Sequence, residues 1–251
     1  IFYGVTQLIY FYNKKKIVFF IKRISLLVVA ATIAIGTFFG EIWSILEYSN
    51  ESIRGKSDLD AGRSGLDKQY AFQYSNGVFE PLTLFFPHIL GGSSQESLDK
   101  NSNLGKALRK NNIATNQINS QLRRVPTYWG DQPLTAPYYA GVICIFLMIF
   151  GFIILKVHEK NWLIYLLVTS VVLSMGSNLE IINNLLFDYL PGYNKFRSVT
   201  FIIIISIFSV VLISCLALQK FIEEPKKYKD DIIKSLYICL LYTSPSPRDD
   251  R

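Results

Sequence analysis

Residues 138–155 read YYAGVICIFLMIFGFIIL and contain no charged side chain. The hydrocarbon core of a bilayer is about 30 Å thick, and a helix needs roughly 20 apolar residues to cross it. Backbone amides in hydrocarbon are satisfied only within a helix or a closed barrel, so this run predicts a transmembrane helix. A second run, Ile24–Ile45, is apolar almost throughout until Glu41 and predicts another.

The composition of the whole chain agrees with these two runs. Half of its 251 residues are hydrophobic, and the mean hydropathy is +0.27. Such values are typical of a membrane protein with several spans. The net charge of +7 would also suit nucleic acid, but the cations flank the apolar runs. We therefore expect the lipid bilayer as a partner and no nucleic acid. The three cysteines have no metal-ligand spacing, and we expect no metal site and no cofactor.

The apolar runs and the polar breaks between them predict an all-α polytopic membrane protein. We expect about four complete transmembrane helices, one partial helix, and a long outer loop region that contains short interfacial helices. The expected segments are a partial helix at 1–12, complete helices at 24–48, 138–156, 161–177 and 198–219, the outer loop region at 49–137, an outer amphipathic helix and turn at 178–197, and a cytoplasmic segment at 220–238.

Lysine and arginine predict the orientation. The linker that ends at Arg23 holds five cations and no acid, the turn at 156–160 holds two lysines, and the segment after residue 219 holds five. Short basic segments stay on the cytoplasmic side of a membrane, so residues 49–137 are expected on the outer side.

Two parts of the outer region have patterns of their own. Val78–Phe86 (VFEPLTLFF) is apolar but too short to span, which favours an interfacial or re-entrant helix. Ser93–Gln121 is polar and weakly periodic, as in a mobile surface segment or a loose helix. Between 178 and 197 an apolar face repeats at helical spacing, which predicts an amphipathic helix in the outer interface. The residues of that face are Ile182, Leu185, Leu186 and Tyr189.

The acids of the outer region have no spacing that picks out a general base, so no catalytic residue is assigned. Its cations are more informative. Arg123, Arg124, Lys195 and Arg197 lie just outside predicted spans on the outer side, against the positive-inside bias. Arginine presents a planar fork that matches phosphate oxygens, so these side chains are candidates for a lipid-linked phosphate. The alternative is that they snorkel to ordinary headgroups.

Three blocks carry a family resemblance: FEPLTLFFPHILGGSSQES at 79–97, RRVPTYWGDQPLTAPYYAG at 123–141 and DYLPGYNKFRSVT at 188–200. In this order, with spans between them, they resemble the bacterial YfhO family of membrane proteins. The resemblance implies an internal fragment of a larger protein in the bacterial cytoplasmic (inner) membrane.

YfhO-like proteins are related to the GT-C glycosyltransferases, which take a sugar from a polyprenyl-phosphate carrier on the outer side of the membrane. The resemblance implies such a reaction on a cell-envelope polymer, with the catalytic acid in an outer loop upstream of Ile1. Two blocks are possible donor-side contacts, one with Tyr128 and Trp129 and one with Lys195 and Arg197.

Other interpretations stay open. A transporter or flippase of a lipid-linked or anionic substrate is one, although no predicted span has the paired Gly/Pro interruptions expected of that class. A non-catalytic scaffold for envelope assembly is another. Separately, Cys239–Asp249 (CLLYTSPSPRD) resembles a translated sequencing adapter, so residues 239–251 are expected to be an artefact.

Overall fold

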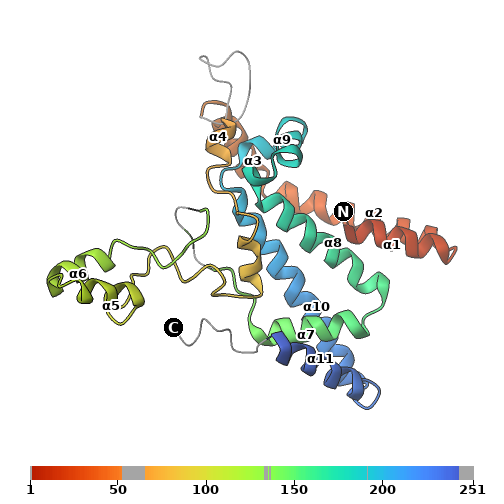
Figure 1. Ribbon diagram of the computed structural model, residues 1–251. Helices are drawn as coiled ribbons and strands as arrows, with labels where there is room; N and C mark the ends of the chain where they lie inside the picture. The colour runs from red at the N-terminus through yellow and green to blue at the C-terminus, as the bar shows by residue number, and fades with distance from the viewer. Residues whose placement is uncertain (1, 53–65, 133–134, 136, 191, 243–251) are drawn as a thin grey trace.

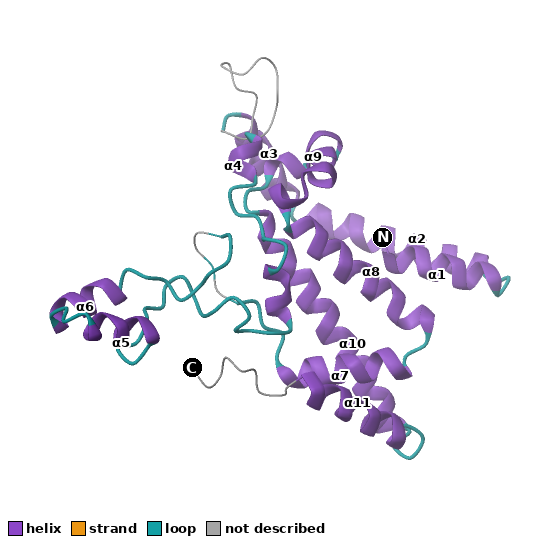
Figure 2. Ribbon diagram, viewed as in Figure 1, coloured by secondary structure: helices purple, strands orange, loops and turns teal. Residues whose placement is uncertain are grey.

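The computed structural model describes residues 2–52, 66–132, 135, 137–190 and 192–242 (Figure 1). Within these ranges the chain is helical and forms no strand, as Figure 2 shows. Two isolated antiparallel bridges, Gly91 with Tyr128 and Ser97 with Pro126, hold the loops together. The expectation of an all-α protein is therefore confirmed for the described residues.

In chain order, the described α-helices are α1 (Phe2–Asn13), α2 (Ile17–Thr37), α3 (Phe39–Asn50), α4 (Lys68–Ala71), α5 (Asn103–Lys110), α6 (Thr115–Leu122), α7 (Val142–Ile154), α8 (Val157–Ser174), α9 (Glu180–Tyr189), α10 (Ile203–Glu223) and α11 (Lys229–Tyr242). Short 3-10 helices are η1 (Glu80–Leu84), η2 (Gly176–Leu179), η3 (Tyr193–Lys195) and η4 (Val199–Ile202).

The core forms where α10 packs against α7 and α8. Its buried apolar residues are Met148, Leu155, Leu163, Val210 and Ile213. Small residues let the backbones approach closely, as in helix packing within membranes. The Ser214 hydroxyl of α10 donates a 2.6 Å hydrogen bond to the carbonyl of Cys144 in α7. The hydroxyls of Ser170 and Ser206 join α8 to α10 at 2.6 Å.

The expected number of four complete spans is not confirmed. Among the described residues, two helices are long and apolar enough to cross a membrane, Ile17–Thr37 and Val199–Glu223. A third candidate is the pair Val157–Ser174 and Gly176–Tyr189, which bends by 109° at a short break. The run at 138–156 forms α7 of only 13 residues, about 20 Å long at 1.5 Å per residue.

The helix α7 is short because the chain before it is extended and bonded to another segment. The amide of Ala140 donates to the carbonyl of Leu84 at 3.1 Å, and Gly141 adopts a φ of +92° that ends the extended stretch. Glycine takes such an angle without the steric cost that a side chain brings. The apolar content of residues 138–141 therefore pairs with the outer loop region instead of lengthening a helix.

The described part of the expected outer loop region contacts α10 and its N-terminal connection at two places. The amide of Ser198, just before α10, donates to the carbonyl of Ala71 at 3.2 Å. Farther along, Phe85 packs on the core cluster of α7, α8 and α10. The segment between them contains η1, a single 3-10 helix, where the sequence favoured an interfacial or re-entrant helix.

The helix boundaries also differ from the expected ones. The apolar residues directly after Lys16 start α2 at Ile17, so Lys22 and Arg23 lie within a helix and not in a linker. The expected span 24–48 is broken at Phe38, where α2 ends and α3 begins. The expected cytoplasmic segment is largely α11, which packs against α7. Residues 239–242 continue α11, and 243–251 lie outside the described residues.

The buried face of α9 differs from the face that the apolar spacing marks. Asn183 and Phe187 are buried, whereas Ile182, Leu185 and Tyr189 are exposed. The Tyr193 hydroxyl donates to the Asn183 side-chain carbonyl at 2.9 Å, which satisfies that buried amide oxygen. The exposed apolar face fits an interfacial position.

Candidate functional site

Glu80 is a buried acid in η1, with 2% of its surface exposed. Its carboxylate accepts hydrogen bonds from the Tyr128 hydroxyl and the Gly77 amide. The backbone amide and the side-chain amide of Gln132 also donate to it, at 3.2 and 3.3 Å. A buried carboxylate is costly unless several donors surround it, and this arrangement supplies them. We call this group of four residues the Glu80 cluster.

Tyr128 forms the other half of the buried pair. Burial and, after it, the hydrogen bond to Glu80 raise the pKa of Tyr128 well above its usual value. The phenol is therefore a neutral donor throughout the physiological range. Gly130 packs over this pair so closely that a side-chain carbon there would overlap both the Tyr128 hydroxyl and a Glu80 carboxylate oxygen.

The Glu80 cluster is tied to the end of α8 through Asn76. The Gln132 side-chain amide donates to the Asn76 side-chain carbonyl. The Asn76 backbone amide donates to the carbonyl of Ser174 at 2.9 Å, and Asn178 donates to the Asn76 carbonyl at 3.0 Å. The side-chain nitrogen of Asn76 is buried with no hydrogen-bond partner. The cluster thus fixes the outer loop region where α8 bends into η2.

A cavity of about 390 Å³ adjoins the Glu80 cluster. Gln132 belongs to both, because it bonds Glu80 and also lines the cavity. The lining residues are Tyr74, Gln132, Thr135, Pro137, Tyr138, Ser198, Thr200 and Phe201. Amide, hydroxyl and aromatic groups together can hydrogen-bond to and stack on a ligand that carries hydroxyls.

Arg197 directly precedes Ser198, which lines this cavity, and it contacts Tyr74, another lining residue. Its guanidinium donates to the Tyr70 hydroxyl at 3.0 Å and to the Gln73 side-chain carbonyl at 2.8 Å. It lies 4.4 Å from the ring centre of Tyr70 and 5.4 Å from that of Tyr74, which lines the cavity. These contacts orient an exposed cation beside Tyr74.

Comparison of the chain with protein-family models, with curated proteins and with solved structures gives no match.

The other predicted site residues are spread over the outer region. The segment that carries α5 and α6 projects from the other helices in Figure 1, and we call it the arm. Arg123 and Arg124 are exposed and directly follow α6 in this arm. Trp129 is 72% exposed, and Tyr128 is buried in the Glu80 cluster. Lys195 ends η3, two residues before Arg197. The structure therefore places Lys195 and Arg197 in one segment, and Arg123 and Arg124 in another.

Glu80, Gln132, Tyr70 and Tyr74 were not among the site residues predicted from the sequence. A signal for Glu80 is present, since it is the one acid in the apolar segment VFEPLTLFF, and an acid among apolar residues is a candidate for burial with partners. Gln132, Tyr70 and Tyr74 have no comparable signal, because their roles depend on segments that meet only in the fold. Asp58 and Asp60, two of the outer acids, lie outside the described residues.

Proposed function

We propose that this chain is part of an integral membrane protein, similar to the YfhO family, that transfers a sugar from a polyprenyl-phosphate carrier to a cell-envelope polymer. The observation that carries the proposal is the guanidinium of Arg197, which two hydrogen bonds orient beside the 390 Å³ cavity. The planar fork of an arginine matches the oxygens of a phosphate.

The chemistry of the cavity supports a sugar next to that phosphate. Gln132, Ser198 and Thr200 offer hydrogen-bonding groups, and Tyr74 and Phe201 offer aromatic faces. In the proposed reaction Arg197 stabilises the charge on the departing polyprenyl phosphate, as preorganised charge does in transfer reactions. The general base for the acceptor hydroxyl is not assigned in this chain. Glu80 is a poor choice because both of its oxygens accept hydrogen bonds within the cluster.

A transporter or flippase is the second candidate, and one observation favours it. The bent pair α8 and η2–α9 is an interrupted apolar segment, and discontinuous helices often form the substrate sites of transporters. The cavity beside Arg197 would then bind the same phosphate-bearing lipid without cleaving it.

The test uses the full-length protein in membrane vesicles with a radiolabelled polyprenyl-phosphate sugar. We expect Arg197→Ala to lower label transfer to polymer about tenfold or more, since a charge-assisted hydrogen bond is lost, and Arg197→Lys to restore part of it. Arg109→Ala, an exposed arginine of the arm, is the matched control.

Transfer that is equal in the Arg197→Ala variant and the wild type would overturn the assignment of Arg197. Label that crosses the membrane without reaching polymer would favour the transporter.

A further inference from the structure

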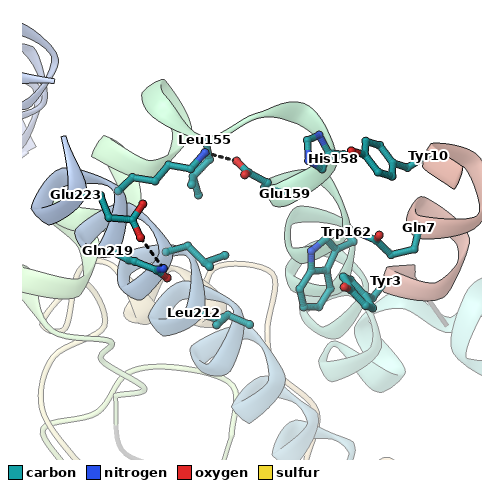
Figure 3. Close-up of a pocket in the computed structure, with 12 residues that line it drawn as sticks. Tyr3, Gln7, Tyr10, Leu155, His158, Glu159, Trp162, Leu212, Gln219 and Glu223 are labelled. Carbon is teal, nitrogen blue, oxygen red and sulfur yellow. Dashed lines mark hydrogen bonds and ion pairs between the residues drawn. The ribbon is translucent and has the colours of Figure 1, made fainter. Parts of the chain in front are cut away.

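A second, larger cavity lies among α1, α8 and α10, at the end of the helices where α7 turns into α8 (Figure 3). Its volume is about 650 Å³. The lining residues include Tyr3, Tyr10, His158, Trp162, Leu212 and Leu216. It is separate from the Arg197 site, since the two share no lining residue.

One part of this cavity is apolar and aromatic. The rings of Tyr3 and Trp162 meet edge to face with their centres 5.0 Å apart. Leu212 and Leu216 of α10 contribute the opposite wall, and Figure 3 shows Leu212 across the space from Trp162. The free energy falls when an apolar chain replaces water on such a surface.

The other part is polar and lies beside a cluster of cations from separate segments. The ring of Tyr10 stacks on His158 with centres 4.9 Å apart, and the ammonium of Lys14 lies 4.6 Å from the Tyr10 ring centre. Lys16 is the residue directly before α2, two positions after Lys14, and Lys156 is the residue directly before α8, two positions before His158. The turn after α1 and the turn before α8 thus carry three lysines next to Tyr10 and His158, which line this end of the cavity.

The acids of the cavity already have partners. Glu159 forms an ion pair with Lys220 that crosses from α8 to α10, drawn as a dashed line in Figure 3. Glu223 accepts a hydrogen bond from the neutral amide of Gln219 at 2.9 Å and keeps its negative charge. Three lysines outnumber this one acid, which leaves an excess of positive charge next to the apolar part of the cavity.

We propose that this cavity binds one anionic glycerophospholipid. Its phosphate lies against Lys14, Lys16 and Lys156, and one acyl chain lies between Trp162 and the leucines of α10. A fully polar anion would leave the apolar wall in water, and a neutral lipid would not use the lysines. An anionic lipid uses both surfaces, as basic pockets between membrane helices do. The proposal does not depend on the sugar-transfer function.

Fluorescence of Trp162 tests the proposal directly, because brominated acyl chains quench a tryptophan that they touch. The full chain would carry Trp43→Phe and Trp129→Phe, so that Trp162 is the single reporter among the three tryptophans. In nanodiscs of phosphatidylcholine, we expect a small fraction of brominated phosphatidylglycerol to quench Trp162 more strongly than the same fraction of brominated phosphatidylcholine.

Two variants test the binding of the lipid headgroup and the binding of the acyl chain separately. Replacing Lys14, Lys16 and Lys156 by Gln should lower the preference for phosphatidylglycerol at least about fivefold, the effect expected for one lysine near a lipid phosphate. The matched control replaces Lys226, Lys227 and Lys229 by Gln, an equal change of charge at the α10–α11 connection and the first residue of α11, and should keep the preference. Leu212→Phe with Leu216→Phe fills the cavity without changing charge and should reduce quenching by both brominated lipids.

Three results would overturn the proposal. One is equal quenching by the two brominated lipids in the otherwise wild-type chain. Another is an equal loss of preference in the control variant, which would indicate only general attraction to the surface. The third is displacement of brominated phosphatidylglycerol by soluble glycerol phosphate, which would identify a soluble phosphate, and not a lipid, as the occupant.

Discussion

The hydroxyl of Tyr128 donates a buried hydrogen bond to the carboxylate of Glu80, a residue 48 positions earlier in the chain. Between these two residues lies the arm that carries α5 and α6. The bond therefore closes the base of that arm and fixes the segment that leads to Gln132. Because Gln132 also lines the smaller cavity, the Glu80–Tyr128 pair positions a wall of the candidate ligand site.

The first prediction concerns the hydroxyl of this pair. Tyr128→Phe leaves a Glu80 oxygen buried without its donor, and such a loss costs about 1–3 kcal/mol. We expect the free energy of unfolding in detergent micelles to fall by that amount. Tyr139→Phe, which removes a hydroxyl from a residue 41% exposed, should change it little. Equal effects of the two substitutions would show that the pair contributes no more than a surface tyrosine.

The second prediction concerns pH. Burial and the bond to Glu80 raise the pKa of Tyr128, whereas an unfolded tyrosine has a pKa of about 10. The neutral phenol is thus favoured by folding, so its stabilisation is complete below about pH 10 and is lost as pH rises toward the native pKa. The difference in unfolding free energy between wild type and Tyr128→Phe should be constant from pH 6 to about pH 9 and shrink above about pH 10. A difference that grows with pH would contradict this sign.

The third prediction concerns Gly130. A methyl group there would overlap the Tyr128 hydroxyl and the Glu80 carboxylate, so Gly130→Ala must separate the pair at a cost of about 1–3 kcal/mol. Gly4→Ala, where a side-chain carbon meets nothing within 4 Å, is the control. In a cycle with Tyr128→Phe the two effects should be far from additive, because both act on one bond. Full additivity would mean that Gly130→Ala acts elsewhere.

The sequence predicted the helical class because hydrophobic runs in a membrane protein leave the backbone few alternatives. It predicted the number of spans less well, and residues 138–155 show why. The run has the apolar content of a span, but Ala140 bonds to Leu84 and Gly141 interrupts the helix. A hydropathy pattern does not reveal that a distant apolar segment will satisfy those amides.

Only those site residues could be predicted whose type and place in the sequence are informative by themselves. Arg197 stood out because an arginine just outside a predicted span, on the side expected to be outer, departs from the positive-inside rule. Its partners Tyr70 and Gln73, by contrast, are ordinary loop residues that approach it across more than a hundred positions. The same holds for Asn183, a polar residue outside the apolar face of α9, whose buried side-chain oxygen accepts a hydrogen bond from Tyr193.

The last prediction concerns the contact between α7 and α10. Gly151 is buried, and a side-chain carbon there would lie 2.7 Å from a methyl group of Ile213 and 3.3 Å from the side chain of Ala217. The first distance is too short for two carbon atoms, so Gly151→Ala must push the helices apart at a cost of about 1–3 kcal/mol. We expect a lower midpoint of thermal unfolding in micelles. Gly36→Ala in α2, where nothing lies within 4 Å, should be neutral or should stabilise by about 0.5–1 kcal/mol, since alanine is the better helix former. If Gly151→Ala lowered the midpoint of thermal unfolding no more than Gly36→Ala does, that result would contradict the close packing of α7 against α10 at Gly151.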